Sequence, residues 1–83
     1  MYETPMMTRA TADHIAKILP TLHPEVKDIE AWHTPSFSAV DFTIRGLWCR
    51  VGQGERYEPF DHPDRELAVT IIEAARRQAY EIR

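Results

Sequence analysis

The stretch FSAVDFTIRGLWCRV, residues 37–51, decides the fold. Apolar and polar residues alternate in its first half, and a period of two is typical of a strand with one buried side. Arg45-Gly46 follows, and a glycine that adopts a positive φ favours a tight two-residue turn. The alternation then resumes, so the stretch predicts a β-hairpin. The residues expected to share its buried side are Val40, Phe42, Ile44, Leu47, Cys49 and Val51.

A third strand is expected upstream, in VKDIEAWH, residues 26–33. Ile29 and Ala31 alternate there with polar residues and Trp32, and the Thr-Pro-Ser sequence at 34–36 is a turn signal. With the hairpin, this strand predicts an antiparallel sheet of three strands. Trp32, Trp48 and Arg50 then fall on the side opposite the aliphatic residues.

Helical periodicity flanks the sheet on both ends of the chain. Thr8 or Thr11 can cap a first helix, which Pro20 is expected to end because proline lacks an N–H and restricts the residue before it. Its apolar stripe contains Ala12, Ile15, Ala16 and Leu19. A second helix is expected from Pro63 onward. Its stripe contains Leu67, Ala68, Ile71, Ile72, Ala75, Ala79 and Ile82.

The order of these elements predicts an α+β fold. It is a two-layer α-β-β-β-α arrangement, a three-stranded antiparallel sheet with both helices packed on one face. Residues 1–83 are expected to form a single small globular domain, with residues 1–7 as a loose N-terminal lead-in. The unpaired edge strands, expected at residues 27–33 and 47–51, allow either a monomer or a homodimer.

Composition narrows the classes of partner. Ten Lys+Arg against 13 Asp+Glu give a formal net charge of −3, without the basic footprint of a free-standing nucleic-acid binder. The single cysteine, Cys49, excludes an internal disulfide and a cysteine-based zinc cluster, and it fits a reducing cytoplasm. No run approaches the roughly 18 apolar residues of a membrane span, and the N-terminus has no basic-then-apolar signal. A cytoplasmic protein without membrane contact is therefore expected.

The tripeptide His62-Pro63-Asp64 is the strongest candidate for chemistry. It matches the tripeptide of J-domain co-chaperones, where a basic helix precedes it, whereas here the sequence GERYEPFD precedes it. Proline suits the first helical position, and Asp61 or Asp64 can accept hydrogen bonds from first-turn amides. The preferred interpretation is that the motif starts the second helix. A small enzyme or ligand-binding protein centred on His62 is kept as an alternative.

No other pattern indicates catalysis or metal binding. None of the four histidines pairs with another at the three- or four-residue spacing that places two ligands on one helix face. Cys49 lies in mid-strand on the apolar side, where a thiol is unreactive, and no G-x-S-x-G elbow is present. The sequence therefore predicts no enzyme, no metal and no cofactor.

In topology the chain resembles the double-stranded RNA-binding domain, which has the same helix–strand–strand–strand–helix order. The resemblance implies a nucleic-acid-binding module. In that family the second helix begins with lysines that bind phosphates. Here that position is DHPDREL, residues 61–67, and its acids would repel the phosphate backbone. Nucleic-acid binding is therefore kept as the first alternative and is not the preferred hypothesis.

The preferred hypothesis is a protein-binding surface. Tryptophan, tyrosine and arginine are the residues that most often anchor interfaces. The partner-binding residues predicted from the sequence are Trp32, Trp48, Arg50, Arg56 and Tyr57. The chain is thus expected to be a non-catalytic protein-binding module, or a stoichiometric inhibitor or regulator. In size and style it resembles inhibitors that phages and mobile elements encode, such as anti-CRISPR proteins. Whether the tryptophans are exposed or packed is left open by the sequence.

Overall fold

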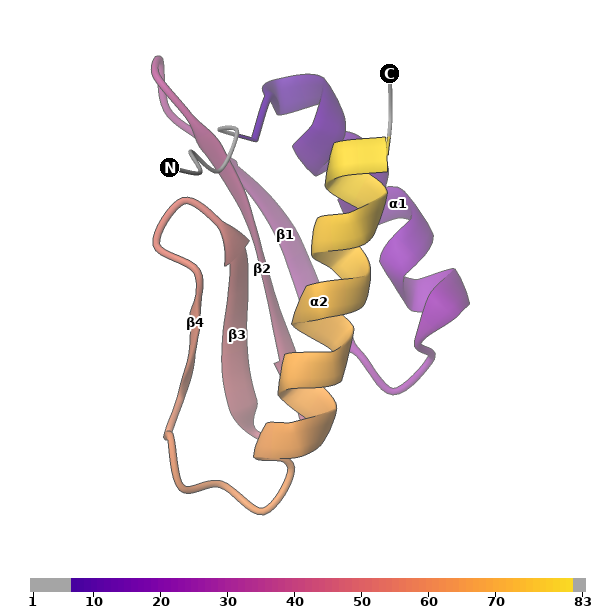
Figure 1. The fold of residues 1–83 in the computed structure, drawn as a ribbon, viewed down its shortest axis with the longest axis vertical. Helices are drawn as coiled ribbons and strands as arrows, with labels where there is room; N and C mark the ends of the chain where they lie inside the picture. The colour runs from indigo at the N-terminus through magenta and orange to yellow at the C-terminus, as the bar shows by residue number, and fades with distance from the viewer. Residues whose placement is uncertain (1–6, 82–83) are drawn as a thin grey trace.

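The computed structural model describes residues 7–81, with side chains through residue 79. The expected α+β class is confirmed, with one helix before the sheet and one after it. The predicted lead-in, residues 1–7, lies outside the described residues except for Met7, which is buried in the core. Ile82 also lies outside them. The elements are α1 (Arg9–Leu22), β1 (Lys27–His33), β2 (Ser38–Ile44), β3 (Leu47–Gly52), β4 (Arg56–Glu58) and α2 (Arg65–Glu81) (Figure 1).

The prediction of three strands is wrong, because the sheet has four in the order β1-β2-β3-β4. The additional strand, β4, pairs antiparallel with β3, with Trp48 opposite Glu58 and Arg50 opposite Arg56. Three residues are too few for an alternating pattern to be visible in the sequence. The pairing exists because the chain turns back directly after β3. β3 was predicted to be an edge strand, but it is an interior strand, and β4 forms that edge of the sheet.

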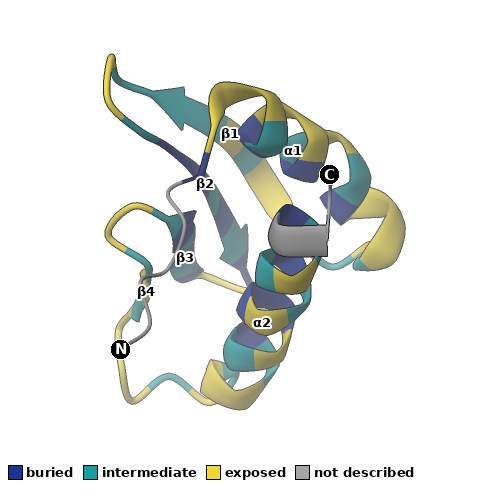
Figure 2. Cartoon of the chain, turned by 45° about the horizontal axis from the view of Figure 1, so that its top comes forward, coloured by how far each residue is buried: buried dark blue, intermediate teal, exposed yellow. Residues whose placement is uncertain are grey.

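The core combines the alternating side of the sheet with one side of each helix. The residues expected on the buried side of the hairpin are all buried, and they join buried residues of both helices in one cluster. Helix α1 contacts β1 and β2, while α2 contacts β3 and α1. Figure 2 shows the buried residues along β2 and β3 and on one side of each helix. The helical members of the cluster are Ala12, Ile15, Leu19, Ala68, Ile71, Ile72, Ala75 and Ala79.

Two glycines shape the strands around β3. Arg45 and Gly46 have φ values of 48° and 86°, so both turn residues are left-handed, as a type I′ hairpin turn requires. The predicted two-residue turn is confirmed, with Ile44 opposite Leu47. Gly52 has a φ of 104°, and a Cβ there would lie 2.8 Å from the Ser38 carbonyl oxygen. Glycine is thus required where the chain leaves β3 toward β4.

Helix α1 begins as predicted and ends later. The Thr8 hydroxyl accepts the backbone N–H of Thr11 at 3.1 Å and caps the helix. The prediction that Pro20 ends the helix is wrong, because the helix continues to Leu22. Pro20 lies exposed in the last turn, where its missing N–H removes one hydrogen bond. The His23 N–H still donates to the Leu19 carbonyl at 2.8 Å and closes the helix.

Candidate functional site

One side of the sheet carries charge and aromatic rings instead of aliphatic residues. Successive side chains of a strand point to opposite faces, so these residues lie opposite the core positions of the same strands. We call this surface the Trp–Arg face and define it by Glu30, Trp32, Asp41, Trp48, Arg50 and Arg56. Its exposed and half-buried positions alternate with the buried ones along β2 and β3.

Cross-strand pairing orders the charges on this face. Glu30 of β1 lies opposite Asp41 of β2, and Asp41 lies opposite Arg50 of β3. Arg50 in turn lies opposite Arg56 of β4. The row is therefore acidic on the first two strands and basic on the last two.

Two indole rings and two guanidinium groups form a continuous stack across this row. The guanidinium carbon of Arg50 lies 4.8 Å from the ring centroid of Trp32 and 5.1 Å from that of Trp48. The guanidinium carbon of Arg56 also lies over the Trp48 ring, 5.0 Å from its centroid. Cation–π attraction of this kind stabilises the stacked arrangement, by about 0.5–1 kcal/mol for each contact at an exposed site.

Arg50 is anchored by Asp41, its cross-strand neighbour on the same face. Its Nε and a terminal nitrogen donate to the two carboxylate oxygens of Asp41 at 2.6 and 2.9 Å, in a bidentate pair. The two side chains are only 18% and 21% exposed. The hydrogen bond to Asp41, together with its negative charge, raises the pKa of Arg50 above its usual value, against the opposing effect of burial. Arg50 therefore stays charged and holds both indoles in place.

The structure brings together four of the five predicted binding residues. Trp32, Trp48, Arg50 and Arg56 share the Trp–Arg face, and both tryptophans are half-buried. Tyr57 does not join them. It packs against the core on the other side of β4, and its ring stacks on Phe60 with centroids 5.8 Å apart. Strand alternation separates Tyr57 from Arg56, and recognising β4 in the sequence would have shown this.

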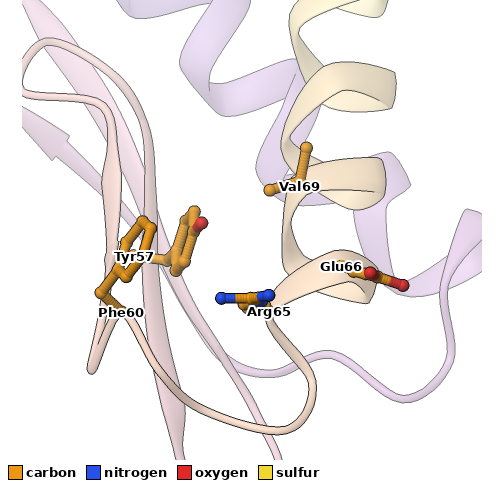
Figure 3. Close-up of a pocket in the computed structure, with 5 residues that line it drawn as sticks. All are labelled: Tyr57, Phe60, Arg65, Glu66 and Val69. Atoms are coloured by element: carbon orange, nitrogen blue, oxygen red, sulfur yellow. The ribbon is translucent and has the colours of Figure 1, made fainter.

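A groove between β4 and α2 was not predicted from the sequence. Two adjoining cavities of about 400 and 210 Å³ share Tyr57 and Val69 as lining residues. Phe60 borders the larger cavity with 69% of its surface exposed, and Arg65 lies 5.9 Å from its ring centroid (Figure 3). An ion pair between Arg76 and Glu55 bridges α2 and the turn before β4. We call this hollow the β4–α2 groove. Its lining residues are Glu55, Arg56, Tyr57, Phe60, Arg65, Glu66, Val69, Ile72, Glu73 and Arg76.

A hydrogen-bonded Ser–His–Asp chain was also missed by the sequence. His33 Nδ1 lies 2.8 Å from the Ser38 hydroxyl, and its Nε2 lies 3.1 Å from Asp13. In acyl-transfer triads the serine uses Nε2 and the acid Nδ1, so the roles are reversed here. Ser38 is 3% exposed, which leaves its hydroxyl little access to a substrate. The chain of contacts ties α1 to the β1–β2 hairpin.

The other candidates for chemistry also have structural partners. His62 Nδ1 accepts the backbone N–H of Asp64 at 3.0 Å, directly before α2. The motif directly precedes the helix, as interpreted, but α2 begins at Arg65, so Pro63 is not its first residue. His62, and not Asp61 or Asp64, accepts the amide. The Asp64 carboxylate instead accepts a hydrogen bond from Arg45 at 3.1 Å. Burial raises the pKa of the Cys49 thiol to about 11, which keeps it protonated and unreactive.

Among the side chains described, residues 7–79, no group of three or more His, Cys, Asp or Glu is placed to hold a metal ion. Neither helix within residues 7–81 is long and apolar enough to cross a bilayer. Comparisons with protein-family models, curated proteins and solved structures found no match.

Proposed function

We propose that the protein is a small non-catalytic module that binds another protein through the Trp–Arg face, with both helices supporting the sheet from the opposite side. The observation that carries this proposal is the stack of Trp32, Arg50 and Trp48. Tryptophan and arginine dominate the binding energy of protein interfaces, because each offers a large, stiff contact area with a polar handle. Here both residue types are half-buried and held on one surface.

Rigidity supports the same proposal. Binding loses free energy when mobile side chains are ordered, by about 0.5–1.5 kcal/mol for each immobilised side chain. The ion pair with Asp41 and the two stacked rings already order Arg50 in the unbound protein. A partner therefore meets a surface whose shape is set in advance. The acidic and basic halves of the row favour one orientation of the partner.

A module of this kind acts by occupying a surface of its partner. Such a mode fits a stoichiometric inhibitor or regulator, of the size and style that phages and mobile elements encode, anti-CRISPR proteins among them. A reducing cytoplasm suits a chain whose single cysteine is buried and free. These assignments rest on the binding role and fail with it.

The proposal is tested by a charge reversal that removes no packing. Glu30 is exposed on β1 within the charged row, so Glu30→Arg places a long cation across the face without opening the core. The matched control is Asp61→Arg, the same change of sign in an exposed loop residue. Both variants, with the wild type, serve as bait in a host lysate, and captured proteins are identified by mass spectrometry.

We expect one protein to be retained by the wild type and by Asp61→Arg and to be lost with Glu30→Arg. Circular dichroism and thermal melting should stay near those of the wild type for both variants, because both positions are exposed. Equal capture by all three baits contradicts a role for this face. A Trp48→Ala variant provides a second measurement of the same kind.

Nucleic-acid binding is a second candidate, and one observation favours it. Single-stranded nucleic acids bind where aromatic rings and cations share a sheet face, as Trp48 and Arg56 do here. Quenching of tryptophan fluorescence by a mixed-sequence oligonucleotide at low salt measures this directly. Binding that weakens steeply as salt rises would indicate that this face binds nucleic acid and not protein. No quenching at low salt leaves protein binding as the function of the face.

A further inference from the structure

The free edge of the sheet has the features of a self-pairing strand. Among the described residues β4 pairs with β3 alone, so its outer side presents unpaired backbone groups. Such an edge is a template for another strand unless charges or a covering element protect it. Here the residues on the edge carry opposite charges in an order that matches a second copy of the same strand.

Arg56 and Glu58 stand two residues apart on one side of β4, with Tyr57 on the other side between them. Their side chains form an ion pair at 3.0 Å and are 51% and 63% exposed. Suppose that a second copy pairs antiparallel, with the two-fold axis through Tyr57. Arg56 then lies opposite the second copy's Glu58, and Glu58 opposite the second copy's Arg56. Opposite charges directly across strands stabilise a pair, and the symmetry gives two such contacts.

We propose that the protein forms a symmetric homodimer by antiparallel pairing of β4 with a second copy, in the register Arg56–Glu58 and Glu58–Arg56. The occupant is the chain itself because the charge order of β4 is complementary to its own reverse. The pairing leaves Trp32, Trp48 and Arg50 outside the interface. It goes beyond the proposed partner binding and does not depend on it.

The test uses charge swaps and sedimentation at increasing concentration of the full chain. The wild type should reach twice the chain mass of 9.7 kDa. Arg56→Glu and Glu58→Arg should each weaken self-association by about tenfold or more, because like charges then face each other twice. The double variant R56E/E58R restores opposite charges and should dimerise again. Arg77→Glu, an exposed charge reversal on α2, is the matched control and should dimerise like the wild type.

Mixing supplies the decisive measurement. The R56E and E58R chains, each weakly associating alone, should form a mixed dimer when combined, because every facing pair is then of opposite sign. A wild type that stays monomeric into the millimolar range overturns the proposal. A dimer that ignores the single swaps, or single variants that do not associate on mixing, also overturns it. If one single variant fails to fold, the double variant and the other single variant decide.

Discussion

The two sides of this sheet are held by different physical means, although they share one backbone. On the helix-contacting side, the strand residues are aliphatic or aromatic and fully buried, for example Phe42 and Leu47. On the Trp–Arg face, Asp41 and Arg50 are bound by directional hydrogen bonds and by stacking between rings and guanidinium groups. Burial stabilises in proportion to the apolar area removed from water, whatever the orientation. Stacking and bidentate pairing depend on geometry.

This difference separates stability from shape. The apolar side supplies most of the free energy of folding, because each buried large side chain contributes about 1.5–3 kcal/mol. The polar side contributes less per residue, since its ion pair loses hydration when it forms. In return it fixes where two indoles lie. A surface for recognition needs that placement more than it needs additional stability.

The largest effect is expected from emptying the apolar side. Phe42 is fully buried, so Phe42→Ala should lower the free energy of unfolding by about 3–5 kcal/mol. Phe37→Ala also removes a phenyl ring, but one that lies beside Trp32 with the ring centroids 5.8 Å apart. This substitution should lower the free energy of unfolding by about 1 kcal/mol. Urea denaturation followed by circular dichroism measures both. Equal losses for the two substitutions would contradict the difference between the two sides.

An intermediate effect is expected from raising the pH, through Cys49 on the apolar side. Burial raises the pKa of its thiol from 9.0 to about 11, so the folded chain keeps a proton that the unfolded chain loses. The contribution of the protonated thiol to the free energy of unfolding is fully present below pH 9 and is lost as the pH rises from 9 toward 11. The loss is about 1.4 kcal/mol per pH unit, or about 2 kcal/mol by roughly pH 10.5.

Cys49→Ala isolates this contribution, because all other ionisable groups are the same in the two chains. Denaturation of the wild type and the variant at about pH 8 and about pH 10.5 gives two differences. The stability gap between the two chains should narrow or reverse at the higher pH. Parallel pH profiles would show that the thiol does not ionise on unfolding.

The smallest effect is expected from weakening the polar side. Asp41→Asn keeps the shape of the side chain and removes the charge that Arg50 contacts at 2.6 Å. The free energy of unfolding should fall by about 1 kcal/mol, since the pair is partly solvated. The tryptophan fluorescence spectrum of the folded protein should also change, because Arg50 then loses the ion pair that holds it against the two indoles. Asp61→Asn, in an exposed loop, should change neither quantity.

Much of the fold could be predicted from local patterns. The hairpin of residues 38–52 follows from strict alternation around Arg45-Gly46, and both turn residues adopt the left-handed conformation that this turn requires. Helix α2 follows from its continuous stripe and from the proline near its start. These signals are local, because each depends on neighbours within one or two turns of the same element.

The candidate site could be predicted only in part. The sequence indicated that Trp32, Trp48 and Arg50 share one side of the sheet, and they do. It could not indicate that Arg50 lies between the two rings, because that contact depends on the register of three strands. Tyr57 was assigned to the same surface because β4 was not recognised, and a three-residue strand forms only when a neighbour is present to pair with it.

By itself, the sequence determined which residues avoid water and with what period, and hence two helices and the strands of a hairpin. Only the tertiary structure decided which side chains from different strands meet: the Trp32–Arg50–Trp48 stack, the Ser38–His33–Asp13 chain, and the groove beside Tyr57. The reason is physical. Hydrophobic periodicity is a property of neighbouring residues in the chain. A contact between distant residues forms only when the strands pair in register and the helices pack on the core.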